Sequence, residues 1–189
     1  MTLKEPRIVK EGELKFVGCG AEGKTGVPHF ESKWKVEEHI GRIGLPATIV
    51  RPVFYIENLS SCFIHVLQLA LMSSYIPSGK TLQMIALDDV GAWVARAFAD
   101  PKAFIGKAEE IAGDELTTVE IIDELRRRGL GAGLPFSFPQ IFFGALPHDI
   151  RKMFGWFGSH GYEADIRTLK RRQPSLMTFR DWLARPRVA

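Results

Sequence analysis

The sequence has few cysteines, no long apolar run and no signal peptide, the features that would indicate a secreted or membrane-bound protein. It contains two cysteines, Cys19 and Cys62, which lie in unrelated contexts and lack the spacing of a disulfide framework. It has no uninterrupted apolar run long enough to span a membrane, since residues 59–76, the most apolar stretch, include serine, histidine and glutamine. Residues 1–13 are polar and mixed in charge, unlike a signal peptide. We therefore expect a cytoplasmic protein with no membrane partner.

A strong excess of charge is also missing. The chain has 25 Lys and Arg against 22 Asp and Glu, which gives a net charge of +3. The densest basic runs, residues 126–128 and 170–172, are expected at solvated helix ends, where cations favour the negative pole of the helix. Aromatic residues are not interleaved with them, so no nucleic-acid partner is predicted. The histidines and the Asp88–Asp89 pair lack ligand spacing, so no metal is predicted either.

The order of segments predicts an α/β fold. Short buried-type strands alternate with segments of helical periodicity, which is typical of a mainly parallel sheet with flanking helices. Strands are expected at residues 14–17, 47–50, 82–87 and 107–112, and helices at residues 28–44, 57–74, 88–100 and 117–129, followed by short helices. The expected helix caps are Asp88 or Asp89, Thr117 or Thr118 with Glu120, and Thr178 with Asp181. A turn is expected at Asp114 and Glu115.

The segment FVGCGAEG, residues 16–23, has the spacing of a dinucleotide-binding motif. Its glycines are Gly18, Gly20 and Gly23, in the pattern Gly-x-Gly-x-x-Gly. A functional motif must open a helix at once, because the pyrophosphate binds at the helix N-terminus. Here residues 24–28 intervene, and the acidic candidates for the ribose, Glu37 and Glu38, fall inside the next helix. The spacing therefore favours an ordinary glycine-containing loop.

Several blocks of the sequence resemble the NmrA-like family, an atypical branch of the short-chain dehydrogenase/reductase superfamily. The blocks are residues 23–59 (GKTGVPHFESKWKVEEHIGRIGLPATIVRPVFYIENL), 82–98 (LQMIALDDVGAWVARAF), 104–117 (FIGKAEEIAGDELT), 154–166 (FGWFGSHGYEADI) and 174–183 (PSLMTFRDWL). They cover most of the chain from Gly18 onward and follow the family's order. By this resemblance, FVGCGAEG is the loop after a later strand, on the nicotinamide side of the fold.

The resemblance implies a partial Rossmann-like α/β domain with a small, mostly helical C-terminal subdomain. The expected divisions are a polar leader (1–13), the C-terminal half of the Rossmann-like domain (14–128) and the helical subdomain (129–189). In the family a glycine-rich, phosphate-binding half precedes the matched blocks. We find no counterpart of it, so we expect the chain to be N-terminally truncated relative to the family.

The resemblance also implies catalytic positions. Superfamily enzymes carry Tyr-x-x-x-Lys on one helix face, where the lysine holds ribose hydroxyls and the tyrosine is a general acid. Lys33 matches this lysine, and His29 stands in place of the tyrosine. A histidine is able to transfer a proton, but the sequence favours the alternative, in which His29 is a helix-start residue that faces solvent. The usual substrate-binding serine is missing, since Phe16 and Val17 occupy its region.

A second block follows the strand at residues 47–50. In the family this loop packs over the nicotinamide ring, which implies cofactor contacts from Pro52, Val53 and Phe54, and a substrate pocket at Tyr55 and Asn58. Such a place is physically sensible, because ligands of open α/β sheets bind beyond the carboxyl ends of strands. The alternative is that the aromatic residues cover the core.

Taken together, the resemblance implies a protein of the NAD(P)-binding type, with NADP or NAD as cofactor. A redox or dinucleotide sensor is expected rather than a robust dehydrogenase, with cofactor binding impaired by the missing half. One alternative is an interaction module or remnant that binds no dinucleotide and pairs with itself or another protein across an exposed sheet edge. Another is an NAD(P)H-dependent reductase of a small substrate, so the question of enzymatic activity stays open.

Overall fold

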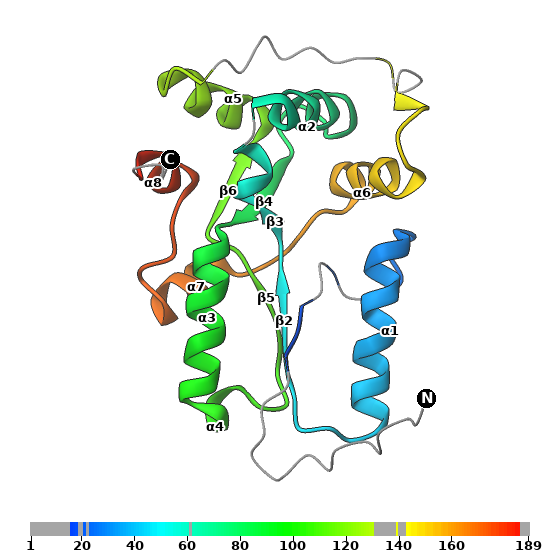
Figure 1. Cartoon of the computed structure of the whole chain (residues 1–189), viewed down its shortest axis with the longest axis vertical. Helices are drawn as coiled ribbons and strands as arrows, with labels where there is room; N and C mark the ends of the chain where they lie inside the picture. The colour runs from blue at the N-terminus through cyan, green and yellow to red at the C-terminus, as the bar shows by residue number, and fades with distance from the viewer. Residues whose placement is uncertain are drawn as a thin grey trace, which may run out of the picture.

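The structure, a computed structural model, describes residues 16–18, 21, 23–60, 62–130, 139 and 143–185. Residues 1–13, Cys19 and Gly20 lie outside the described residues, as do residues 131–138 and 140–142. Figure 1 shows an elongated molecule, in which one half is built on a sheet between two helices and the other half is mainly helical.

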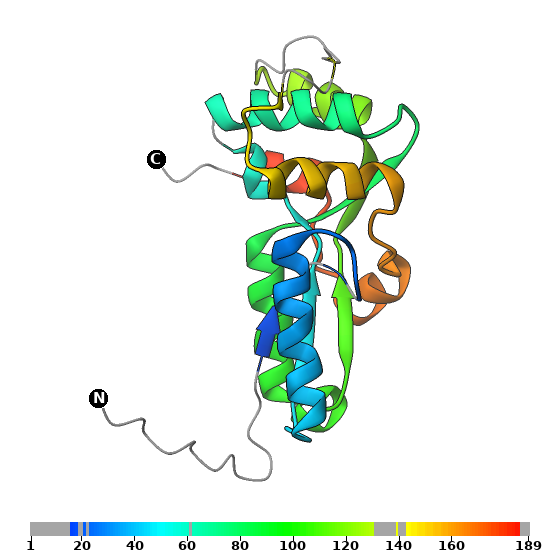
Figure 2. The same ribbon diagram turned by 90° about the vertical axis from the view of Figure 1, so that its right-hand side faces the viewer.

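The first sheet is entirely parallel. It contains β1 (Phe16–Gly18), β2 (Thr48–Pro52) and β5 (Ala108–Ile111) in the order β1-β2-β5. Helix α1 (Pro28–Arg42) lies on one face and α3 (Leu87–Ala99) on the other (Figures 1 and 2). The predicted α/β fold, with a parallel sheet and flanking helices, is confirmed.

A second, smaller sheet continues from the first. It contains β3 (Phe54–Tyr55), β4 (Thr81–Ile85) and β6 (Asp114–Thr117), with β3 parallel and β6 antiparallel to β4. Only Val53 separates β2 from β3, and its N–H donates to the carbonyl of Ile111 at 3.3 Å. The segment that leads from one sheet to the other is therefore held by backbone bonding.

The turn expected at Asp114 and Glu115 is wrong, because both residues belong to β6. Asp114 pairs with Met84 in the antiparallel register, and the Glu115 carboxylate accepts hydrogen bonds from Thr81 and Gln83. Pairing with β4 overrides the weak strand propensity of acidic residues, since strand formation depends on the partner strand.

The single helix expected over residues 57–74 is also wrong. A short 3₁₀ helix, η1 (Ile56–Leu59), is followed by α2 (Cys62–Tyr75). The Ser60 N–H and hydroxyl both donate to the carbonyl of Glu57, at 2.9 and 2.6 Å. Such local bonds compete with helix continuation.

The expected N-cap of α3 is corrected in the same region. The N-cap residue is Ala86, and Asp88 and Asp89 lie in the first turn. Glu57 supplies the missing acceptor, because its Oε1 accepts the Leu87 N–H at 3.0 Å. A carboxylate distant in the sequence thus replaces the local cap, at the positive end of the helix.

The other predicted caps are confirmed. Helices α5 (Thr118–Arg127) and α8 (Phe179–Ala184) each begin with a capping box. The boxes consist of Thr117 with Glu120, and of Thr178 with Asp181. The remaining helices are α4 (Pro101–Phe104), α6 (His148–Ser159) and α7 (Ile166–Arg172). Both basic runs reach the last turns of helices, α5 and α7, as expected.

Buried apolar residues form two clusters. The larger surrounds the second sheet and includes Phe54, Met72, Ile122, Phe157 and Phe179. The smaller packs α3 against the strands and consists of Val50, Val53, Ile85, Trp93, Ala97, Phe104, Ile111, Ala112, Leu169 and Leu176. Residues after position 143 contribute to both clusters, so the C-terminal part packs closely onto the rest. The division at residues 128 and 129 stays a prediction.

Candidate functional site

A cavity of about 270 Å³ lies where β2 passes into β3. It is lined by His29, Phe30, Lys33, Pro52, Val53, Phe54, Tyr55, Asn58, Met153, Phe157 and Tyr162. All seven residues singled out from the sequence as catalytic, cofactor-binding or substrate-binding are in this lining. The structure therefore brings them together beside the carboxyl end of a parallel strand, where open α/β sheets hold their ligands.

Helix α1 positions His29 and Lys33 at one side of the cavity. Pro28 occupies the first helical turn, where its missing N–H is not needed. Phe30 is buried and packs edge-on against Trp156, with ring centroids 5.5 Å apart, which fixes the start of the helix. His29 and Lys33 are four residues apart, so both project from one helix face. Lys33 is exposed, and it is free to meet a ligand from solvent.

His29 has a carboxylate partner on a different helix. Its Nδ1 lies 3.4 Å from Oδ2 of Asp149, in the first turn of α6, and the side chains are 37% and 40% exposed. A proton on Nδ1 is favoured by this carboxylate, which leaves Nε2 available to accept or transfer a proton. His29 is thus partly solvent-facing, as one reading of the sequence had it, but it is also oriented.

The segment from Pro52 to Phe54 forms a buried wall. Val53 and Phe54 are 2% and 4% exposed, and Phe54 meets Phe157 edge-on with ring centroids 6.1 Å apart. Tyr55 is half-buried and Asn58 is exposed. Phe54 therefore belongs to the core, as one of the two alternatives had it, and it also lines the cavity, while its contact with a cofactor stays a prediction.

Two tyrosine hydroxyls face conditions that keep them neutral. Burial raises the pKa of Tyr162 far above its ordinary value, and the charge of Glu110 and the nearby Tyr55 raise it further. Burial also raises the pKa of Tyr55, with an added effect from Glu57. A neutral phenol donates one hydrogen bond and accepts others. Both side chains can therefore orient a polar ligand at neutral pH.

Sequence reasoning missed part of the lining. Met153 and Phe157 lie on α6, and Tyr162 follows it, packed edge-on against Trp156 with centroids 5.1 Å apart. The only sequence signal was the block at residues 154–166, which contains Phe157 and Tyr162 but carries no residue pattern with a chemical meaning.

The described part of the glycine segment is not followed directly by a helix. β1 ends at Gly18, and α1 begins only at Pro28. Gly23 has a positive φ of +77°, typical of a turn, and Gly20 lies outside the described residues. The prediction that no helix opens directly after these glycines is confirmed. Glu37, the candidate ribose acid, instead forms an ion pair with Arg51.

The described residues contain neither a metal cluster nor a membrane span. Among the residues that the structure describes, no three His, Cys, Asp or Glu side chains gather closely enough to hold a metal ion. Within the same residues, no helix combines the length and apolar character that crossing a membrane requires.

Known proteins share this fold and sequence pattern. The NmrA-like family matches residues 20–183. The structure is similar to the crystal structure of a nucleoside-diphosphate-sugar epimerase from Staphylococcus aureus, with a TM-score of 0.68 and 14% sequence identity. The match covers 91% of this chain and 64% of that chain, so this chain spans less than two thirds of the epimerase's length. The resemblance seen in the sequence blocks is confirmed: the chain belongs to the NmrA-like family.

Proposed function

We propose that the protein is a dinucleotide sensor or regulatory protein whose cavity at the β2–β3 junction takes the nicotinamide end of NAD or NADP. The observation that carries the proposal is the convergence of Lys33, His29 and the Pro52–Phe54 wall on one cavity. Membership of a family of the NAD(P)-binding type supports it. The fold of the sugar epimerase is consistent with it.

The residues present fit this end of a dinucleotide. Lys33 has three N–H donors and is exposed, so it would hold ribose hydroxyls. Val53 and Phe54 supply the apolar wall for a flat ring, and Asn58 and Tyr55 supply polar groups. No carboxylate is among the lining residues. A volume of about 270 Å³ lies just below the range of small-molecule sites, about 300–1,000 Å³, so it suits only a part of the dinucleotide.

Binding of the whole dinucleotide should be weak. A tight pyrophosphate site needs backbone N–H groups at a helix N-terminus that opens directly after a glycine-rich turn. Within the described part of the chain, the glycine segment ends several residues before α1. We therefore expect impaired affinity, and a low-micromolar dissociation constant in calorimetry would contradict this.

A reductase of a small substrate is the second candidate function. The nicotinamide would supply hydride chemistry when bound. The His29–Asp149 pair would hold the proton at Nδ1 and leave Nε2 to transfer a proton, while the neutral Tyr162 hydroxyl would orient the substrate. Consumption of NADPH with a carbonyl substrate, lost in His29→Phe, would favour this candidate over a sensor.

An interaction module is the third candidate. β1 is an outer strand of the first sheet among the described residues, so one side of its backbone is free to pair with a partner. The partner would be a second copy or another protein. Sedimentation over a wide concentration range tests the second copy, and an unchanging monomer would count against it.

Thermal unfolding with millimolar NADPH, NADP or NAD tests the main proposal. Binding to the native state raises the melting temperature by mass action. The shift should be lost in Lys33→Ala and kept in Lys35→Ala, an exposed lysine of the same helix outside the cavity. No shift with any dinucleotide would overturn the sensor proposal. An equal shift in both variants would overturn the assigned role of Lys33.

A further inference from the structure

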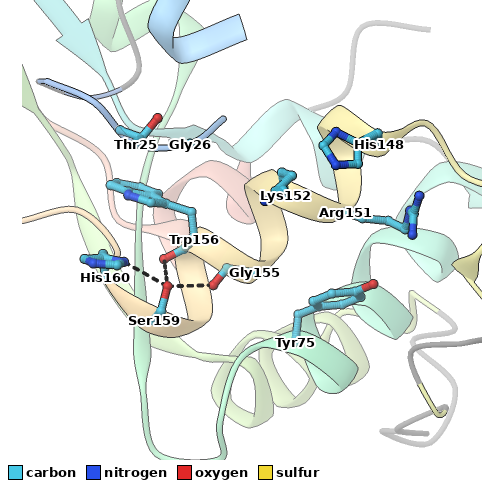
Figure 3. A pocket seen from close by; sticks show the side chains of 10 residues that line it. All are labelled: Thr25, Gly26, Tyr75, His148, Arg151, Lys152, Gly155, Trp156, Ser159 and His160. Atoms are coloured by element: carbon cyan, nitrogen blue, oxygen red, sulfur yellow. Dashed lines mark hydrogen bonds between the residues drawn. The ribbon is translucent and has the colours of Figure 1, made fainter. Parts of the chain in front are cut away.

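Helix α6 separates the cavity at the β2–β3 junction from a second, larger cavity. This second cavity, which we call the basic groove, has a volume of about 390 Å³. Figure 3 shows its lining: Thr25, Gly26, Tyr75, His148, Arg151, Lys152, Gly155, Trp156, Ser159 and His160. Met153 and Phe157 of the same helix line the first cavity instead. The two cavities therefore use different faces of one helix.

The basic groove has only one sign of charge. Its ionisable cations are Arg151 and Lys152, with imidazoles from His148 and His160, and none of the lining residues is a carboxylate. His148, Arg151 and Lys152 have the i, i+3 and i+4 spacing that places side chains on one helix face. The ion pairs formed by the described residues do not include Arg151 or Lys152. The groove thus offers positive charge that no described residue neutralises through an ion pair.

Arg151 supplies the guanidinium of the groove. Its Nε is fully buried and has no hydrogen-bond partner among the described residues. Buried donors are nearly always satisfied, so an orphaned one calls for an explanation. Because Nε itself is closed to solvent, an anion in the groove would bind the other N–H groups of the guanidinium, whose fork matches two phosphate oxygens.

The other walls are aromatic and firmly held. Trp156 and His160 stack, with an interplanar angle of 9°, and the Ser159 hydroxyl lies 2.8 Å from His160 Nδ1. Tyr75, from α2, lies on the side of the groove where Arg151 is (Figure 3). Rings at the groove suit a planar organic group attached to the anion. The volume is sufficient for a small molecule but not for a whole dinucleotide.

We propose that the basic groove binds a small phosphate-bearing molecule, with Arg151 and Lys152 on the phosphate and Trp156 and Tyr75 beside the organic part. The inference is independent of the proposed function, because it assigns a second ligand to a different face of α6. Inorganic phosphate could itself be the ligand, or a phosphate ester could be, and the two sources are separable by experiment.

The test is a titration of the full chain with inorganic phosphate and, separately, with phenyl phosphate. Binding is monitored by backbone NMR at constant ionic strength. We expect saturable shifts in the signals of residues 148–160 with both probes. Tighter binding of phenyl phosphate would assign the site to an ester, and equal affinity would assign it to free phosphate. Shifts that rise linearly without saturation, or that are spread over the surface, would overturn the proposal.

Variants separate a built site from general charge attraction. Arg151→Met and Lys152→Met should each weaken binding about tenfold or more. Lys102→Met, an exposed lysine of α4, removes the same charge and should have no effect. Lys152 is exposed, so its variant is expected to fold even if Arg151→Met does not. Unchanged binding in Lys152→Met would overturn the proposal. Lys33→Ala should leave phosphate binding intact, and its loss there would mean that the two sites are one.

Discussion

The carboxylate of Glu37 and the guanidinium of Arg51 form a buried ion pair, with Nη2 and Oε2 2.7 Å apart and side chains 3% and 7% exposed. Arg51 Nε also donates to both carboxylate oxygens at 3.2 Å. Glu37 lies one helical turn after Lys33, and Arg51 directly precedes Pro52. The pair therefore fixes the spacing of α1 and β2 at the point where both contribute to the cavity at the β2–β3 junction.

Removal of this carboxylate should strongly destabilise the protein. Glu37→Ala leaves the Arg51 charge buried without this partner, which typically costs about 3–5 kcal/mol. For a chain of this size, each kcal/mol lowers the melting temperature by about 2–4 °C. Glu38→Ala, an exposed neighbour, should change stability by less than about 0.5 kcal/mol. Similar melting temperatures for the two variants would show that the ion pair contributes little.

The approach of α6 to α2 depends on Gly158. A Cβ at this position would lie 2.1 Å from the Tyr75 carbonyl oxygen, so Gly158→Ala must force the helices apart. Overpacking of this kind costs about 1–3 kcal/mol. Gly155→Ala is the matched control, because its Cβ would be 4.0 Å from the nearest Tyr75 atom. There the loss of helix-interior glycine should stabilise by about 0.5–1 kcal/mol. Chemical denaturation that ranks the two variants in the opposite order would contradict the packing described.

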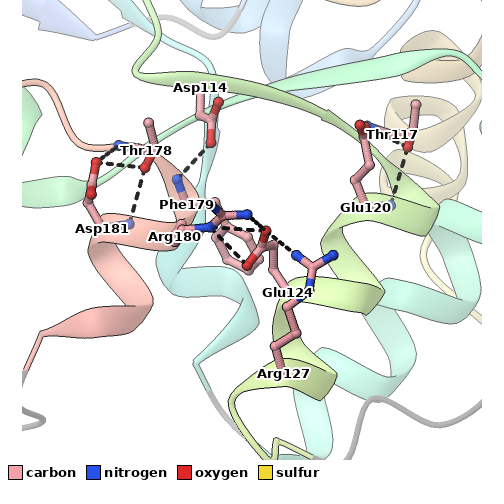
Figure 4. A network of polar contacts seen from close by, with 9 residues as sticks. All are labelled: Asp114, Thr117, Glu120, Glu124, Arg127, Thr178, Phe179, Arg180 and Asp181. Carbon is pink, nitrogen blue, oxygen red and sulfur yellow. Dashed lines mark hydrogen bonds and ion pairs between the residues drawn. The ribbon is translucent and has the colours of Figure 1, made fainter.

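The capping box of α8 should make stability depend on pH. Figure 4 shows Thr178 and Asp181 bonded to each other, beside the Glu124–Arg180 pair that joins α5 to α8. The Thr178 hydroxyl and N–H hold the pKa of Asp181 below its ordinary value of 3.8. Because the pKa of Asp181 is lower in the folded state than in the unfolded state, its ionised form stabilises the native protein at pH values above the unfolded-state pKa. This contribution is lost as the pH falls through the folded-state pKa.

Thr178→Ala therefore has an expected effect that varies with pH. At neutral pH the lost cap should lower the free energy of unfolding by about 1 kcal/mol. This cost should become smaller at pH values below the ordinary pKa of Asp. Urea midpoints across acid and neutral pH measure it. Ser175→Ala, an exposed serine nearby, serves as the control. A cost that stays constant at all pH values would argue against the charge of Asp181 as its cause.

Asp89 should behave in the opposite way. Its side chain is buried, and burial raises its pKa despite the Met177 N–H bond at 2.9 Å, with a further rise from the charge of Asp88. A raised folded-state pKa means that the native state holds the proton more tightly. Stability is then lost as pH rises from the ordinary value of 3.8 through the raised pKa.

Asp89→Asn tests this directly. Its amide oxygen can still accept the Met177 N–H but does not ionise, so the variant should equal or exceed the wild-type stability at neutral pH. The difference should disappear as pH approaches the ordinary Asp range. Asp89→Leu, which loses the acceptor, should destabilise at every pH. An Asn variant that is less stable by the same amount at all pH values would contradict the raised pKa.

Residues close together in the sequence determined much of the fold. Thr117 with Glu120, and Thr178 with Asp181, were predictable as caps because a box needs only residues three apart. The alternation of β-branched strands and periodic helices likewise predicted the parallel sheet and the helices on its two faces. His29 and Lys33 share a helix face for the same local reason.

Contacts between distant residues decided the rest. The cap of α3 comes from Glu57, the partner of His29 is Asp149, and Tyr162 completes the cavity begun by residues 29–58. β6 formed where a turn was expected, because β4 offered it a partner. The sequence alone determined the main helices and parallel strands and the capping boxes of α5 and α8, since propensity and capping act within a few residues. Only the tertiary structure decided which side chains meet, because long-range packing and pairing outweigh weak local preferences.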